Sequence, residues 1–236
     1  MKKLIMFDLD GTLLPMDEEV FAKAYFKELC RKMAPRGYDP ERLVSTLWEG
    51  TAAMVRNDGT RTNEEAFWEV FCKNFSAEMK TRDYPLFEEF YLNEFANART
   101  SCGFAQEAAE VIRMCENAGK RIILATNPVF PRPATRARVR WAGLEPEQFE
   151  WITTYENSCH AKPDPDYYRD LLKKAGVEGS ECVMIGNDAR EDLAAKKAGI
   201  DVFILTDCLI NRDGTDLEDV PHGTWRDLKE YLNSVF

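Results

Sequence analysis

The chain has 236 residues, 44% of them hydrophobic, and its 31 Lys and Arg against 41 Asp and Glu give a formal net charge of −10. This length suits one large domain or a core domain with an insert, and the hydrophobic fraction argues against wholesale disorder. The acidic balance disfavours nucleic acid and anionic membrane surfaces as partners, because both are bound through clustered Lys and Arg. We therefore expect a globular protein that binds neither.

The seven cysteines are widely scattered and form no CxxC pair, so the sequence indicates neither a disulfide framework nor a zinc site. The apolar stretch 4–7 near the start ends at Asp8. It is shorter than the roughly 7–15 apolar residues of a secretory signal. No apolar run approaches the roughly 18 residues of a membrane-spanning helix. We expect a cytoplasmic protein with reduced thiols.

Residues 3–7 are predicted to form a short buried strand, after which the pattern becomes helical. Three helix starts can be read from the sequence: an acidic first turn at 17–19, an Asp-Pro pair at 39–40 and a capping box at 62–65. About four helices are therefore expected within residues 17–97.

From Phe104 onward, predicted helices and short apolar strands alternate. Such alternation indicates a parallel sheet covered by helices on both faces. The predicted fold is α/β: a doubly wound parallel sheet formed by residues 1–16 and 98–236, with an all-helical cap domain at 17–97 inserted after the first strand. The later strands are expected at 121–125, 151–153, 182–185 and 202–205, and the helices around 111–119, up to about 141, at 166–175, up to 198 and at 224–232.

Polar residues follow four of the predicted strands. The first strand leads into Asp8-Leu9-Asp10-Gly11-Thr12 and the second into Thr126-Asn127. Lys162-Pro163 lies in the loop after the third, and Gly186-Asn187-Asp188 follows the fourth, with Asp192 one helical turn on. Because the carboxyl ends of parallel strands meet at one edge of a sheet, these groups are expected to gather there.

Four clustered carboxylates need a counter-charge. Two unit charges about 4 Å apart repel by roughly 4 kcal/mol at an effective dielectric near 20. A divalent cation offsets this repulsion, and an all-oxygen ligand set selects Mg²⁺. Because Mg²⁺ at such sites is usually shared with substrate phosphate, the pattern favours a phosphorylated ligand.

Four motifs in order resemble those of the haloacid dehalogenase superfamily, in its phosphatase branch with a helical C1-type cap. They are Asp8-Leu9-Asp10-Gly11-Thr12-Leu13, Leu124-Ala125-Thr126-Asn127, Lys162-Pro163-Asp164-Pro165 and Gly186-Asn187-Asp188 with Asp192. The resemblance implies a Rossmann-like core and an Mg²⁺-dependent phosphatase. That enzyme would hydrolyse a small phosphorylated metabolite, a phosphate monoester, through an aspartyl-phosphate intermediate.

The resemblance also implies a role for each motif residue. Asp8 would be the nucleophile, since a carboxylate with a pKa near 3.9 is already ionised at neutral pH. Asp10 would be the general acid and base. Thr126, Asn127 and Lys162 would bind the phosphoryl group, and Thr126 and Lys162 would also be catalytic. The implied metal ligands are Asp8, Asp10 (through its backbone carbonyl), Asp188 and Asp192.

The fourth motif departs from the commoner pattern, in which an aspartate follows the glycine. Counting back from Ala198-Gly199 puts Asn187 in the aspartate position, whereas the Asp-x-x-x-Asp spacing selects Asp188. We favour Asp188, because a carboxylate binds a dication better than an amide does. Which acid binds the metal directly stays open.

Several alternatives remain. Dehalogenases lack the second aspartate, so Asp10 favours phosphate ester hydrolysis, but a phosphomutase would share the same motif residues. A phosphonate hydrolase would need a Schiff-base lysine in the cap, where surface lysines are the simpler interpretation. A receiver domain is about half this length and lacks the insert. A catalytically retired binding protein is disfavoured by the retained motif residues.

Other features have plainer interpretations. We expect Arg132, Arg136, Arg138 and Arg140 to form a solvated helix face, and His160 to lie in a surface turn. The cap is expected to open and close about hinges near 14–17 and 97–103. The sequence does not identify the substrate, the cap residues that select it or the oligomeric state. Most cap aromatics are expected in the core, with one or two facing the substrate: Phe21, Tyr25, Trp48, Phe67, Trp68, Phe71, Phe87, Phe90 and Tyr91.

Overall fold

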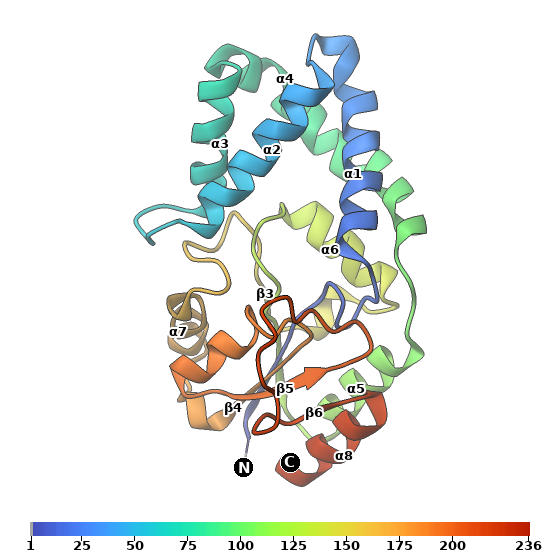
Figure 1. Ribbon diagram of the computed structural model, residues 1–236, viewed down its shortest axis with the longest axis vertical. Coiled ribbons are helices and arrows are strands. Elements are labelled where there is room, and N and C mark those ends of the chain that lie inside the picture. Colours follow the sequence, from blue (N-terminus) through green and yellow to red (C-terminus); the bar gives the residue numbers. More distant parts are fainter. Residues whose placement is uncertain (1) are drawn as a thin grey trace.

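A computed structural model describes residues 2–236 and contains one six-stranded parallel sheet, in the order β3-β2-β1-β4-β5-β6. β1 is central, so chain segments that follow its neighbours converge beside its carboxyl end (Figure 1). The predicted doubly wound α/β fold is confirmed. The strands are β1 (Leu4–Phe7), β2 (Arg121–Leu124), β3 (Trp151–Ile152), β4 (Cys182–Gly186), β5 (Asp201–Leu205) and β6 (His222–Gly223).

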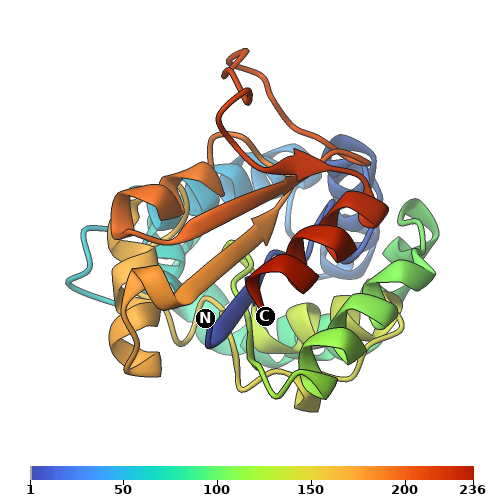
Figure 2. The ribbon, with the colours of Figure 1, turned by 90° about the horizontal axis from the view of Figure 1, so that it is seen from below.

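Both faces of the sheet are buried, because alternate residues of each strand point to opposite sides. Ile5 and Phe7 face a cluster that includes α5 (Gln106–Asn117), α6 (Arg132–Trp141) and α8 (Trp225–Val235). Leu4 and Met6 face a second cluster with α7 (Pro165–Ala175). Figure 2 shows the sheet between these two layers. This double coverage explains why the strands read as short, wholly apolar runs.

The inserted helices stand above the carboxyl ends of the strands (Figure 1). The expected starts are present: Asp17 accepts hydrogen bonds from two backbone amides of the first turn, Asp39 accepts one, and Thr62 forms a capping box with Glu65. Each cap satisfies amides that lack an intrahelical partner. The helices are α1 (Glu18–Met33), α2 (Pro40–Val55), α3 (Asn63–Asn74) and α4 (Ala77–Leu92), with 3₁₀ helices η1 (Ala34–Arg36) and η2 (Glu94–Ser101).

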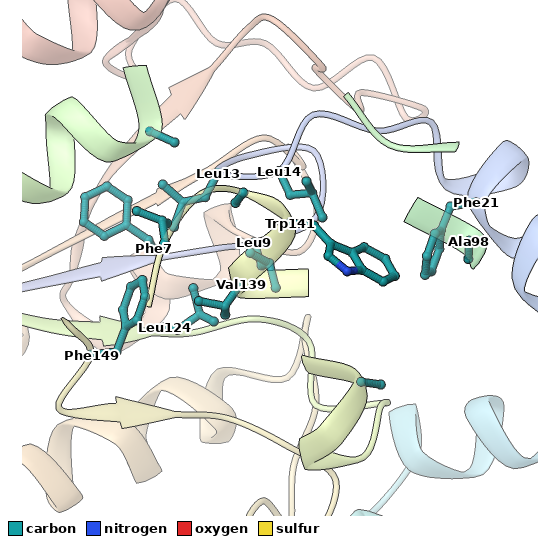
Figure 3. Close-up of a cluster of buried hydrophobic side chains, with 14 of the residues drawn as sticks. Phe7, Leu9, Leu13, Leu14, Phe21, Ala98, Leu124, Val139, Trp141 and Phe149 are labelled. Carbon is teal, nitrogen blue, oxygen red and sulfur yellow. The ribbon is translucent and has the colours of Figure 1, made fainter. Parts of the chain in front are cut away.

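The cap and the sheet share one hydrophobic cluster, and Trp141 at the end of α6 joins them. Figure 3 shows Trp141 between the sheet side, with Leu9 and Leu14, and the cap side, with Phe21 and Ala98. Its ring stacks on Phe95 of η2, with centroids 5.1 Å apart and an interplanar angle of 24°. The two parts are therefore packed together rather than joined by the chain alone.

The first residues of α3 also bind the core. The buried Asn63 donates its side-chain amide to the carbonyls of Pro128 and His160, each at 3.2 Å. Its backbone amide donates to the Ser158 carbonyl at 2.8 Å, and that of Glu64 donates to the Tyr155 carbonyl at 2.9 Å. The cap is thus attached to the core at a point far from the two places where the chain crosses between them.

The structure differs from the expected elements after β4. A helix up to Ala198 was predicted, but only a 3₁₀ helix, η5 (Leu193–Ala198), forms. Asp188 accepts hydrogen bonds from the amides of Arg190 and Glu191, so residues 188–192 form turns that leave little length for a helix. The two-residue strand β6 was not predicted, since so short a pairing has no periodicity to read. Two further 3₁₀ helices are η3 (Pro146–Gln148) and η4 (Gly179–Glu181).

All seven cysteines are unpaired thiols. Cys115 and Cys182 are fully buried, and the other five are partly buried rather than core residues. Across residues 2–236, no helix combines the length and the apolar character that crossing a membrane requires.

One buried charge in the cap depends on its partners. Asp83 of α4 is fully buried. Its Oδ1 accepts hydrogen bonds from Arg36 Nε at 3.2 Å and Arg82 Nε at 2.9 Å. The hydrogen bonds from Arg82, above all, hold the pKa of Asp83 below its usual value, against the opposing effect of burial. Ionised Asp83 therefore stabilises the folded cap.

Asp83→Asn should lower the free energy of unfolding by about 1.5–3 kcal/mol at pH 7, because it removes charge-assisted hydrogen bonds. The folded pKa lies below the unfolded value of about 3.9. The wild-type advantage is thus fully present above that value and is lost as the pH falls through the folded pKa. Urea unfolding of wild type and Asp83→Asn, at pH 7 and at low pH, measures this difference in the free energy of unfolding. The exposed Asp166→Asn is the control. An equal loss at both pH values would contradict the assignment.

Candidate active site

Asp8 lies directly after the central strand, where its amide donates to the Ile185 carbonyl of β4 at 2.8 Å. Its side chain is buried and meets Lys162, whose Nζ is 2.9 Å from Asp8 Oδ1 and 2.7 Å from Asp192 Oδ1. Lys162 is itself buried, so one ammonium group bridges two buried carboxylates. The sheet brings Asp8 together with Lys162, 154 residues further on, and with Asp192, another 30 residues on.

Burial sets the electrostatics of this group. It raises the pKa of Asp8 to about 7, with further contributions from the Asp192 and Asp10 carboxylates, although Lys162 acts in the opposite direction. For Lys162, burial acts to lower the pKa. The Asp192 and Asp8 carboxylates outweigh it and hold the Lys162 pKa well above its usual value. Lys162 is therefore charged at neutral pH.

The turn after Asp8 brings Asp10 to the same place. Gly11 has a φ of 81°, and a Cβ there would collide with the side chain of Asn187. The turn therefore requires glycine. The Thr12 hydroxyl lies 3.2 Å from Asp8 Oδ2 and 3.0 Å from Asn187 Oδ1, and it can donate to one of them at a time. Oδ1 of Asp10 is buried and has no hydrogen-bond partner among the described residues.

Arg138 corrects one prediction and supplies a residue that we did not predict. The expected solvated arginine face exists only in part: Arg132 and Arg140 are exposed, but Arg138 is fully buried. Its guanidinium forms an ion pair with Asp10 Oδ2 and lies 4.2 Å from the centre of the Phe130 ring. The spacing could have revealed it, because Arg138 stands four residues after Ala134 and so shares its apolar helix face.

The residues of the fourth motif have different partners. Asp192 points inward, and its Oδ2 accepts the amides of Asn187 and Asp188, each at 3.0 Å. Gly186 makes room for this carboxylate, since a Cβ would occupy the same space. The side chain of Asn187 is engaged by Thr12 and by the Cys208 carbonyl at 2.7 Å. Both Asn187 and Asp188 line the cavity, but the Asn187 side chain is held in the turn, so Asp188 is the carboxylate of the two.

The second motif lies beside a further acid that we did not predict. Thr126 is buried at the cavity wall, and its carbonyl accepts hydrogen bonds from Thr153 at 2.6 Å and Tyr167 at 2.9 Å. The Asn127 amide donates to both carboxylate oxygens of Glu191, at 3.0 and 2.9 Å. Burial raises the pKa of Glu191 to about 8. Glu191 could have been suspected from the sequence, because it directly precedes Asp192 of the fourth motif.

The oxygen donors of this site fit a hard divalent cation. Asp8, Asp10 and Asp188 line one cavity together with Asp192 and Glu191, and within residues 2–236 only Lys162 and Arg138 form ion pairs with members of this set. The buried Oδ1 of Asp10, which has no hydrogen-bond partner among residues 2–236, is an acceptor that the protein leaves uncompensated. Carboxylate and carbonyl oxygens suit Mg²⁺ rather than a softer metal.

Above the carboxylates, a cavity of about 330 Å³ extends into the cap. The prediction that one or two cap aromatics line it is wrong. Of the nine aromatics named in the sequence, all but Phe71 and Phe90 line the cavity, and Trp48 is 54% exposed. The expectation that most of them lie in the core is confirmed for six of the nine. Helical spacing finds inward-facing rings but does not tell a packed interior from a hollow one.

Comparison with known proteins identifies the family. The family model described as haloacid dehalogenase-like hydrolase matches residues 2–199. The chain is 24% identical to Phosphoglycolate phosphatase 1 of Pseudomonas aeruginosa over 204 residues, which is 86% of this chain and 69% of that protein. It is 32% identical over 112 residues to SUPPRESSOR OF QUENCHING 1, chloroplastic, of Arabidopsis thaliana, covering 48% of this chain but only 10% of that protein.

Solved structures show the same fold. A 2-haloacid dehalogenase from Pseudomonas syringae pv. Tomato DC3000 superposes with a TM-score of 0.64 at 23% identity, covering 99% of both chains. The family match spans most of the chain and includes all four motifs. The expected superfamily is thereby confirmed, and the chain belongs to the haloacid dehalogenase-like hydrolases.

Proposed function

We propose that this hydrolase is an Mg²⁺-dependent phosphatase that cleaves a small phosphate monoester through an aspartyl-phosphate intermediate. The observation that carries the proposal is the placement of Asp8. It follows the central strand directly, contacts Lys162 at 2.9 Å and faces one cavity with Asp10, two residues on. The phosphatases among its relatives support this activity over others in the family.

In the first step, a carboxylate oxygen of Asp8 attacks phosphorus, and the bond from phosphorus to the ester oxygen breaks. Asp10 gives its proton to the departing alcohol. Lys162 neutralises charge on the nucleophile and on the transferring phosphoryl group, and Thr126 at the cavity wall would donate its hydroxyl to a phosphoryl oxygen. A leaving halide needs no proton, so Asp10 supports ester cleavage rather than dehalogenation.

In the second step, water attacks phosphorus and its proton passes to Asp10. The acyl phosphate bond breaks, which regenerates Asp8 and releases inorganic phosphate. Asp8, the backbone carbonyl of Asp10 and Asp188 would hold Mg²⁺. The Asp192 carboxylate is engaged by Lys162 and two amides and would support them from behind. Bound Mg²⁺ would supply a positive charge that offsets both the carboxylates and the phosphoryl oxygens.

Asn127 has a modified role in this proposal. Its side-chain amide is bound to Glu191, so it reaches a phosphoryl oxygen only by exchanging that partner. Asn127 Oδ1 is buried without a partner among the described residues. The pair of Asn127 and Glu191 therefore forms the wall of the site until a ligand competes for the amide.

The first test measures phosphate release from p-nitrophenyl phosphate by wild type and Asp8→Asn, with Mg²⁺ and with EDTA. Turnover should require Mg²⁺ and fall to the detection limit in Asp8→Asn, since an amide cannot form the intermediate. The exposed Asp201→Asn is the matched control and should retain full activity. Activity that survives in Asp8→Asn would refute the nucleophile assignment.

A second test concerns Arg138, which we assign as a positioning residue that holds the Asp10 carboxylate. Arg138→Met and Asp10→Asn should lower kcat/KM for an alkyl phosphate by about 10²–10⁴-fold, the range for general acid catalysis. The loss for p-nitrophenyl phosphate should be much smaller, because nitrophenolate departs without a proton.

Arg140→Met, on the same helix but exposed, is the control, and Arg138→Lys should restore part of the activity on the alkyl ester. Equal losses on both substrates would mean that Arg138 acts only through stability. Thermal unfolding of each variant identifies that case.

A further inference from the structure

The cavity above Asp8 has two chemically different halves. Its lower part holds the carboxylates of the core, and its upper part is lined by aromatic rings. Phe26 and Trp48, from α1 and α2, meet edge to face with centroids 5.2 Å apart. Tyr25 meets Phe130 of the core in the same way at 5.5 Å. Flat apolar walls of this kind favour a flat apolar guest.

No residue lining this cavity, among those that the structure describes, is Lys, Arg or His. Lys162 is already engaged by two aspartates and Arg138 by Asp10. Lys80 lies 5.0 Å from the centre of the Trp68 ring but does not line the cavity. The upper part instead contains Glu88 and Glu156. One carboxylate oxygen of Glu156 accepts the Arg132 amide, and the other is buried with no hydrogen-bond partner among residues 2–236.

This charge pattern selects against a second anionic group on the substrate. A carboxylate or second phosphate in the upper cavity would lose its water without gaining a cation, and it would face Glu156. An unpaired charge in such a place is strongly unfavourable. Phosphorylated acids and bisphosphates are therefore poor matches for the upper cavity.

The size of the cavity points to a substrate larger than a two-carbon ester. Its volume is about 330 Å³, which includes the part beside the carboxylates that would hold the phosphate. A dry apolar cavity of about 150 Å³ suffices to bind benzene. A short alkyl ester would leave the aromatic walls uncovered and gain little from them.

From these observations we propose that the substrate is the phosphate monoester of an aromatic alcohol with no second anionic group. The proposal rests on the phosphatase activity proposed above and names the class of alcohol that the cap selects. The phosphate sits among the motif residues, and the ring lies between the cap and core aromatics.

The test compares kcat/KM for four esters with Mg²⁺ present: ethyl phosphate, 2-phenylethyl phosphate, 2-(4-carboxyphenyl)ethyl phosphate and 2-phosphoglycolate. The two arylethyl esters release primary alkoxides of nearly the same basicity and differ in one remote charge. 2-Phenylethyl phosphate should exceed each of the other three by about tenfold or more. Equal or faster turnover of phosphoglycolate, ethyl phosphate or the carboxyphenyl ester would overturn the substrate class while leaving the phosphatase intact.

Failure of the underlying activity has a different signature. If none of the four esters and not even p-nitrophenyl phosphate is hydrolysed, the phosphatase proposal itself falls, and the substrate class with it. The two outcomes are therefore separated within one panel.

Trp48 gives an independent check, because it lines the cavity and is 54% exposed, so its removal leaves no hole in a packed core. Trp48→Ala should lower the ratio of kcat/KM for 2-phenylethyl phosphate over ethyl phosphate several-fold. The matched control is Phe104→Ala, which removes an aromatic ring that is 62% exposed and lies outside the cavity. An unchanged ratio in Trp48→Ala would contradict the proposal that the aromatic ring of the substrate binds against Trp48.

Discussion

The site depends on one ammonium group held between two buried carboxylates. Lys162 bridges Asp8 and Asp192. Without it, two negative charges would stand in a buried loop cluster beside the ends of β1 and β4. Removing one partner from such a buried set is strongly unfavourable, typically by about 3–5 kcal/mol. The bridge thus joins three separate segments of the chain. Thr12 and the amides of Asn187 and Asp188 in turn contact the two bridged carboxylates.

Around this bridge the chain separates charge from apolar surface. The carboxylates lie at the carboxyl edge of the sheet, where loop amides and Thr12 can satisfy them. Arg138 extends the charged layer to Asp10 and stacks on Phe130, at the border with the aromatic cap. The phosphoryl group would therefore lie in a charged, polar environment and its alcohol in an apolar one, within a single cavity. With this division, the core can keep its chemistry while the cap determines which alcohol is accepted.

The sequence was sufficient for the fold and for the motif residues because both follow from local patterns. Apolar strands between amphipathic helices determine the sheet, and the strand-end rule gathers Asp8, Lys162 and Asp192. Arg138 was predicted to be solvated because it is charged, although its spacing from Ala134 places it on the apolar face of the helix. Glu191 was missed because its burial depends on how the loop after β4 folds. The short η5 and the hollow between the cap aromatics depend on packing, which spacing does not report.

The attachment of α3 has a consequence for how often the cavity stands open. If the cap swings about its chain crossings, the hydrogen bonds that Asn63 and Glu64 make to the core must be exchanged for water. At about 0.5–1.5 kcal/mol each, four such bonds sum to roughly 2–6 kcal/mol, so the open form would hold at most a few per cent of the unliganded molecules. Apparent substrate affinity falls in proportion to the binding-competent fraction. A contact remote from phosphorus would thereby contribute to KM.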